Sequence, residues 1–145
     1  MKKIFIFFVI ILIIIAIFSF NYISYNMNNE KILKDNYYFE QYQDKELNGL
    51  DIATLINKAI DQNTKNKIEK DEKGLFIENE ENSLQIEIYM LDNETIYKME
   101  TIYNGGTDQF VQYYGNIEFK CSKIEYHQKT GRVKYLYLEQ IQQPS

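Results

Sequence analysis

Cys121 and His127 are the one nucleophile–base combination that the sequence offers, because its 145 residues contain a single Cys and a single His. Both lie in a segment that alternates like a β-strand, in which six residues span about 20 Å. A catalytic dyad needs hydrogen-bond reach, so this spacing excludes the pair. We expect Cys121 to be a small core residue and His127, beside a predicted turn, to be exposed.

Acidic side chains gather at two predicted turns and are the other source of chemistry. Glu78, Glu80 and Glu81 form one group and Asp92 and Glu94 the other, and neither has the Asp-x-Asn-x-Asp-Gly spacing of a calcium loop. The single Cys excludes a disulfide framework and a multi-cysteine zinc or iron–sulfur site. With 21 Asp and Glu in the chain, the number of acidic residues does not exclude adventitious calcium binding or a carboxylate pair for glycoside hydrolysis. The sequence nevertheless predicts no cofactor, no metal site and no enzyme activity.

Tyrosine is the residue type whose surplus points to binding. The chain has 13 Tyr and no Trp, and exposed Tyr is enriched at protein interfaces. AT-rich codons, together with the strand preference of Tyr, are an alternative explanation of the surplus. The candidate interaction surface consists of Tyr89, Tyr113, Tyr114, Tyr126, Tyr135 and Tyr137.

The N-terminal segment predicts a membrane anchor. Lys2 and Lys3 precede the run from Ile4 to Phe20, in which Ser19 is the single polar residue. As a helix this run spans about 25 Å, close to the hydrocarbon thickness of a bilayer. The two lysines predict a cytoplasmic amino terminus, so we expect membrane lipid to contact this helix and the rest of the chain to lie outside the cell.

A cleaved signal peptide is the competing interpretation of the same segment. Cleavage needs small residues at alternate positions, and the stretch from Ala16 to Phe20 does not supply them. No lipoprotein cysteine follows the apolar run. We therefore expect an uncleaved single-pass anchor over residues 1–25.

Charge limits the partners of the outward part. The whole chain has a net charge of −5 and a single Arg, which argues against nucleic acid as a partner. The residues after the anchor carry 14 Lys and Arg against 21 Asp and Glu, a balance that anionic head groups repel.

Residues 26–47 connect the anchor to the predicted domain at 48–145. No Gly or Pro occurs before Asn48, so the membrane helix can continue outward through Glu46. A polar stalk rich in Asn and Lys is the alternative, and the pattern does not decide between them.

The domain begins with a helix and continues with a sheet. Asn48 and Asp51 have the spacing of a capping box, and apolar residues recur at helical spacing up to Ile60, so we expect a helix ending near 62–66. From Gly74 the period is two, which predicts strands at 75–78, 84–90 and 95–103 and a short turn around Phe110.

The last two strands form the clearest hairpin. The alternation changes phase near Ser122 and Lys123, which predicts a β-bulge, and Gly131 supplies a left-handed turn residue. Residues 133–141 are apolar on both faces and are expected inside the sheet. The predicted fold class is α+β: a helix packed on an antiparallel sheet of about five strands.

A lysine pair, a membrane helix without breakers, a short helix and an antiparallel sheet together resemble the architecture of type IV pilins and pseudopilins. The prepilin motif is absent, since Ile4 to Phe20 contains neither the Gly nor the Glu of that motif. The stretch from Leu47 to Ile60 is similar to small membrane-anchored proteins of unknown function from low-GC Gram-positive bacteria. This second resemblance implies no activity.

Two functions follow as hypotheses. The first is a non-enzymatic structural or interaction protein whose outward domain binds another envelope protein. The second is a small ligand- or cell-wall-binding module that uses the same tyrosine surface.

Overall fold

The fold is α+β, as predicted from the sequence. The computed structural model describes residues 2–141, so Met1 and the last four residues of the predicted 48–145 domain lie outside the described part. The chain divides into two compact units, Met1–Asp35 and Asn36–Ser145. The elements are α1 (Lys2–Glu40), β1 (Glu46–Asn48), α2 (Gly49–Lys65), β2 (Gln85–Met90), β3 (Thr95–Lys98), α3 (Met99–Gly105), α4 (Thr107–Tyr114), β4 (Glu118–Tyr126) and β5 (Val133–Gln140).

Helix α1 is one uninterrupted helix of 39 residues. The helix therefore continues beyond Tyr25, as in the first of the two alternatives for residues 26–47, and it ends at Glu40, short of the predicted limit at Glu46. The reason is tertiary pairing: the Asp44 N–H donates to the carbonyl of Cys121 at 3.1 Å, and β1 then pairs with β4. Asn36 and Phe39, in the last turn of α1, are already buried in the second unit.

Helix α2 begins as the sequence predicts. The Asn48 side chain accepts the Asp51 N–H at 2.9 Å, and the Asp51 carboxylate accepts the Asn48 N–H at 3.0 Å, which completes the capping box. The C-cap is Asn66, inside the predicted range. The buried face of α2 holds the apolar set at helical spacing, Ile52, Leu55, Ile56, Ala59 and Ile60.

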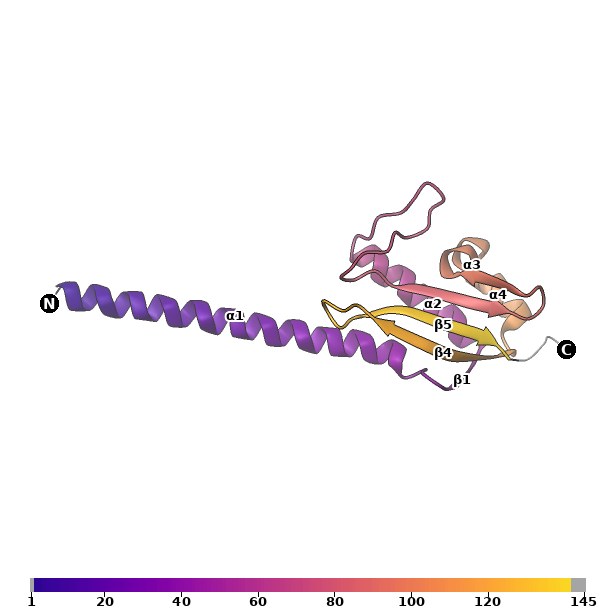
Figure 1. The fold of residues 1–145 in the computed structure, drawn as a ribbon, viewed down its shortest axis with the longest axis horizontal. Helices are drawn as coiled ribbons and strands as arrows, with labels where there is room; N and C mark the ends of the chain where they lie inside the picture. The colour runs from indigo at the N-terminus through magenta and orange to yellow at the C-terminus, as the bar shows by residue number, and fades with distance from the viewer. Residues whose placement is uncertain (1, 142–145) are drawn as a thin grey trace. The chain divides into compact units, whose positions relative to one another are not determined.

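The sheet has five strands in the order β1-β4-β5-β2-β3, with β5 at its centre. The expectation of an all-antiparallel sheet is wrong for one pair, because β2 and β5 run parallel. Parallel neighbours need a crossover connection, and α3 and α4 supply part of it between β3 and β4. The sheet is therefore mixed (Figure 1).

Two of the predicted strands differ in the structure. Residues 75–78 do not form a strand of the sheet; within them Phe76 makes an isolated bridge with Lys70. The sheet reaches five strands because β1, which the sequence did not predict, joins it. The predicted strand at 95–103 ends at Lys98, where α3 begins. The helix forms there because Met99 and Glu100 become buried and the Glu100 carboxylate accepts the Phe76 N–H at 3.0 Å.

The hairpin of β4 and β5 is confirmed. The register shifts between Cys121 and Lys123, where the bulge was predicted, and Gly131 has a φ of 66°. Helices α2, α3 and α4 form a layer on one face of this sheet, and α2 lies behind it in the view of Figure 1. The core between the layers includes Ile86, Ile88, Leu136 and Leu138, all nearly or fully buried.

Candidate functional site

Cys121 has the environment of a core residue. Its side chain is fully buried, as predicted, and its Sγ contacts the Lys123 carbonyl at 3.8 Å. Burial raises the pKa of the thiol to about 11, and the thiolate is the reactive form. Cys121 is therefore a poor nucleophile in the folded chain.

The expectation that His127 is exposed is wrong. Its side chain is 3% exposed, and its Nε2 lies 2.7 Å from the carbonyl oxygen of Ser83. The hairpin that carries His127 also holds the loop before β2, because the Thr130 hydroxyl donates to the Glu81 carbonyl at 2.6 Å. The ring thus joins the two segments and contributes to structure.

Three members of the two acidic groups, Glu78, Glu80 and Asp92, are held by partners within the domain. Lys134 contacts Glu78 at 2.5 Å, and Lys129 forms an ion pair with Glu80. Asp92 accepts hydrogen bonds from the Tyr114 hydroxyl and from Gln140. Within residues 2–141 no group of three His, Cys, Asp or Glu side chains is placed to hold a metal ion.

Three of the predicted tyrosines come together on the sheet. Tyr89 on β2 and Tyr135 and Tyr137 on β5 alternate with buried residues, so they lie on the face opposite the helices. The parallel register places Tyr137 beside Glu87, and the Tyr135 hydroxyl donates to the Glu87 carboxylate at 2.8 Å. Burial and this hydrogen bond raise the pKa of Tyr135. These three residues are the sheet tyrosines.

Tyr113 and Tyr114 lie elsewhere, on α4. Tyr113 is 75% exposed, whereas Tyr114 stacks on Phe110 with ring centroids 5.1 Å apart. The Tyr114 hydroxyl donates to Asp92 at 2.7 Å, and this hydrogen bond is the main reason that the pKa of Tyr114 rises to about 12. Tyr114 therefore joins α4 to the turn between β2 and β3.

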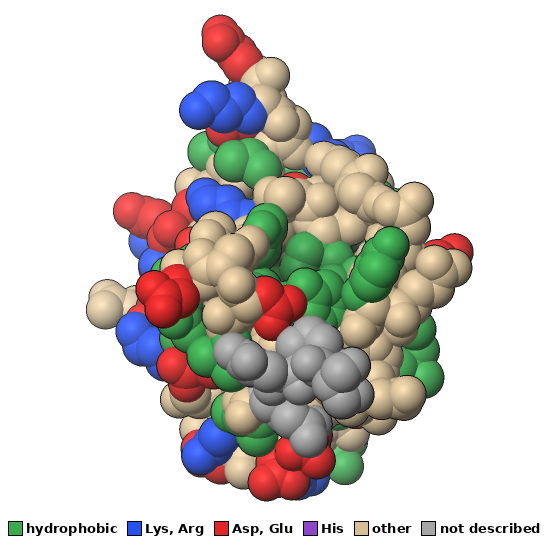
Figure 2. All heavy atoms as spheres, turned by 90° about the vertical axis from the view of Figure 1, so that its right-hand side faces the viewer, with side chains coloured by type: hydrophobic (Ala, Val, Ile, Leu, Met, Phe, Trp, Pro, Cys, Tyr) green, Lys and Arg blue, Asp and Glu red, His purple; other side chains and the backbone are tan. Residues whose placement is uncertain are grey.

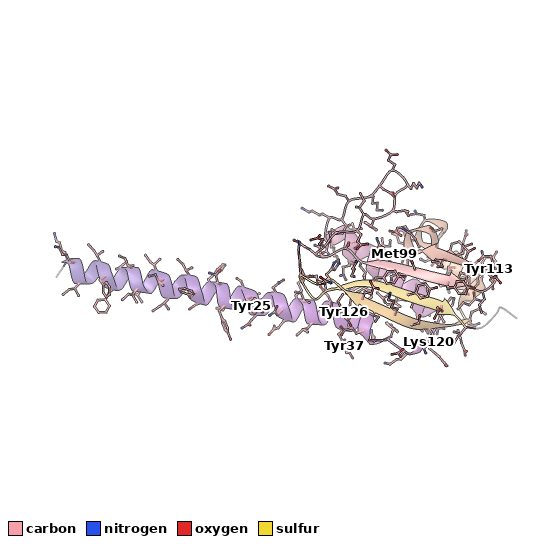
Figure 3. The ribbon with its side chains drawn as sticks, in the orientation of Figure 1. Tyr25, Tyr37, Met99, Tyr113, Lys120 and Tyr126 are labelled. Carbon is pink, nitrogen blue, oxygen red and sulfur yellow. The ribbon has the colours of Figure 1, made fainter. Side chains whose placement is uncertain are left out.

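Tyr126 lies at a third place. Its hydroxyl donates to the Glu40 carboxylate at 3.0 Å, and its ring lines an open depression of about 460 Å³ between the β4–β5 hairpin and residues 78–80. Figure 3 shows Tyr126 and Tyr113 at opposite ends of the domain. The six tyrosines therefore do not form one surface.

An apolar hollow that the sequence did not predict lies between β3, α3 and α4. It consists of two adjoining depressions of about 170 and 210 Å³, which share Tyr97, Ile102 and Phe110 as walls. Met90 and Tyr114 line the first, and Tyr113 lies at the second. Figure 2, which views this end of the domain, shows hydrophobic side chains gathered on it.

The hollow was not predicted because helix α3, which forms one of its walls, was not identified from the sequence. This helix has seven residues, too few for a 3.6-residue period to be read, so Ile102 was assigned to a strand. The alternation of Tyr97 with its neighbours was visible in the sequence, but its position beside Phe110 depends on how α4 packs.

Comparisons with protein-family models, with curated proteins and with solved structures give no match to this chain. The pilin-like resemblance therefore stays a prediction.

Proposed function

We propose that this chain is a single-pass membrane protein of the bacterial envelope whose outward domain binds another protein and performs no catalysis. The observation that carries the proposal is the exposure of the apolar segment. α1 contains an 18-residue window of mean hydropathy 3.1, none of which is buried. A core helix of a water-soluble protein hides such a surface, whereas a bilayer covers it without help from the chain.

The length and flanks of α1 support a spanning helix. The run from Ile4 to Phe20 is apolar on every side, with Phe5 and Phe18 each 71% exposed. Tyr22 and Tyr25 follow it, where the aromatic belt of a bilayer would lie. Lys2 and Lys3 at the start favour a cytoplasmic amino terminus, which puts the second unit outside.

Binding is favoured over catalysis by the state of the reactive side chains. Cys121 is buried with a raised pKa, and His127 is engaged by the Ser83 carbonyl. The surface of the second unit, in contrast, exposes large side chains such as Tyr113 and Ile96. Exposed aromatic and aliphatic area of this kind serves recognition.

Cysteine labelling tests the outward orientation. Lys73 lies in an exposed loop, and Lys73→Cys should react with a membrane-impermeant maleimide on intact cells. The unsubstituted chain is the matched control, because its Cys121 is buried and should stay unlabelled. Labelling of Lys73→Cys that requires cell lysis would refute the outward domain. The mass of the membrane-bound chain, compared with the full 17.4 kDa, separates an uncleaved anchor from a cleaved signal peptide.

A second candidate function is binding of a cell-wall polymer. The depression beside Tyr126 favours it, because an aromatic ring there is surrounded by Glu78, Glu125 and Lys134. An aromatic face with polar groups around it suits a carbohydrate. Saturable binding of purified wall polymer that is lost in Tyr126→Ala and kept in Tyr113→Ala would support this candidate over the first.

A further inference from the structure

Strand β3 is an edge of the sheet. It pairs with β2, and the strand order places no described strand on its other side. Thr95, Ile96 and Lys98 are exposed, with Ile96 at 50%. An edge strand presents N–H and C=O groups that can pair with another chain. The edge of β3 is therefore a place where a strand can be added.

The apolar hollow lies beside this edge, on the helix side. The register places Tyr97 opposite Ile88, which points into the core, and places Ile96 opposite Tyr89 on the other face. Tyr97 is a wall of both depressions of the hollow. A strand added next to β3 would thus direct every second side chain toward the hollow.

We propose that the β3 edge binds an extended segment of a partner protein as a sixth strand, with an apolar side chain of that segment in the hollow. The inference rests on the proposed binding function and names its site and the chemistry of its partner. Main-chain hydrogen bonds to β3 would give affinity, and the hollow would select the side chain. An apolar cavity of about 150 Å³ accommodates a benzene ring, so each depression has room for one aliphatic or aromatic side chain.

The charges around the site define the rest of the partner. Asp92 and Glu94 lie in the turn before β3, and Asp108 lies in the first turn of α4. All three are exposed, and Lys98 is the basic residue of β3 itself. An acidic rim favours a segment with Lys or Arg next to its apolar anchor.

The same charges disfavour a second copy of this chain as the occupant. A second copy would bring the same excess of acidic over basic residues to this edge, since the chain has a net charge of −5. Like charges placed together across an interface cost free energy. The partner is therefore a different protein with a basic, extended segment.

Peptide selection tests the site on the full chain. The chain is placed in lipid nanodiscs, and displayed random peptides of about ten residues are selected on them after removal of those that bind empty nanodiscs. We expect peptides with alternating apolar positions and at least one Lys or Arg. Apolar residues at helical spacing, or no enrichment, would overturn the proposal.

Two further measurements locate the binding. Thr101 lines the hollow and is exposed, so Thr101→Trp should fill it and weaken the selected peptide by about tenfold or more, as loss of a hot spot does. Gln112, exposed on α4 and not among the residues of the hollow, gives the matched control Gln112→Trp. Equal affinity of both variants would refute the hollow as the binding site.

N-methylation of the peptide tests strand pairing without changing the protein. In a peptide paired along one edge, every second N–H donates to the neighbouring strand. Methylation of an amide in that set should abolish binding, whereas methylation of the amides between them should not. Equal effects at all positions would refute an added strand. A chain that dimerises in detergent, with β3 amide protection that depends on its concentration, would instead make the second copy the occupant. The labelling of Lys73→Cys is independent of these results, so failure of the outward orientation is distinguishable from failure of this site.

Discussion

Asn63 provides the sharpest test of how this domain is held together. The side chain is fully buried on α2, its Nδ2 donates to the Leu84 carbonyl at 2.7 Å, and its Oδ1 accepts the Leu84 N–H at 2.8 Å. Leu84 is itself fully buried. The substitution Asn63→Ala removes both partners and leaves two backbone groups unpaired in the core.

The expected loss of stability follows from those two groups. A buried donor or acceptor without a partner costs about 1–3 kcal/mol, so Asn63→Ala should lower the free energy of unfolding by about 2–6 kcal/mol. A domain of this size has about 5–15 kcal/mol in total. Asn57→Ala is the matched control on the same helix, because Asn57 is exposed and makes one long hydrogen bond of 3.4 Å to Thr107.

Urea unfolding of the full chain in detergent micelles measures the effect. Near-ultraviolet circular dichroism reports the packed tyrosines of the domain and does not follow the backbone helicity of α1, whose Tyr22 and Tyr25 are exposed. With a slope of about 1–3 kcal/mol per molar urea, a loss of about 3 kcal/mol moves the midpoint by about 1–3 M. A midpoint for Asn63→Ala that equals the midpoint for Asn57→Ala would show that the paired contact with Leu84 does not carry the predicted weight.

A second substitution at the same position separates loss of the donor from loss of packing. Asn63→Asp keeps an acceptor for the Leu84 N–H but faces the Leu84 carbonyl with oxygen. Burial raises the pKa of a carboxyl, so this variant should be destabilised at neutral pH and should recover in part as the pH falls and the carboxyl becomes a donor. An Asn63→Asp chain whose stability does not change with pH relative to the unsubstituted chain would refute this explanation.

Three other outcomes are expected. Gly49→Ala should destabilise the fold by about 1–3 kcal/mol in the same assay, because the added Cβ would lie 1.9 Å from the Tyr114 carbonyl oxygen. Gly105→Ala is the control and should not change the stability, because a Cβ added there meets no neighbouring atom within 4 Å. Cys121 should resist a thiol reagent at pH 8 until urea unfolds the domain, because it is fully buried; reaction in the folded chain would contradict this. Tyr114 has a pKa of about 12 in the folded chain against 10.0 in the unfolded chain, so the stability that its hydroxyl contributes is complete below pH 10 and is lost between pH 10 and 12. Tyr114→Phe should therefore lose less stability over this pH range than the unsubstituted chain. The same dependence of stability on pH in both chains would argue against the hydrogen bond to Asp92.

The features that were predicted correctly depend on neighbours along the chain. The capping box joins Asn48 to Asp51, three residues away, and Gly131 satisfies a local turn. The bulge after Cys121 was visible as a change of phase in the alternation. Such patterns are readable because a helix and a hairpin impose their own spacing on the residues within them.

The features that were missed depend on residues far apart in sequence. The burial of His127 follows from its contact with Ser83, 44 residues away. The helix at Met99 forms where Glu100 can accept the Phe76 N–H, 24 residues away. No local pattern contains such pairings. The positions of the candidate tyrosines depend on long-range contacts as well, since Tyr114, Tyr126 and Tyr135 bond to partners 22, 86 and 48 residues away.

The sequence by itself determined an apolar helix with a basic start, the α+β class, the limits of α2 and the β4–β5 hairpin, because the period and the turn residues of these elements are local. Only the tertiary structure decided the parallel pairing of β2 with β5 and the edge position of β3 beside an apolar hollow. The reason is that strand order and the packing of α4 are set by which buried surfaces meet, and these surfaces come from segments that are far apart in the sequence.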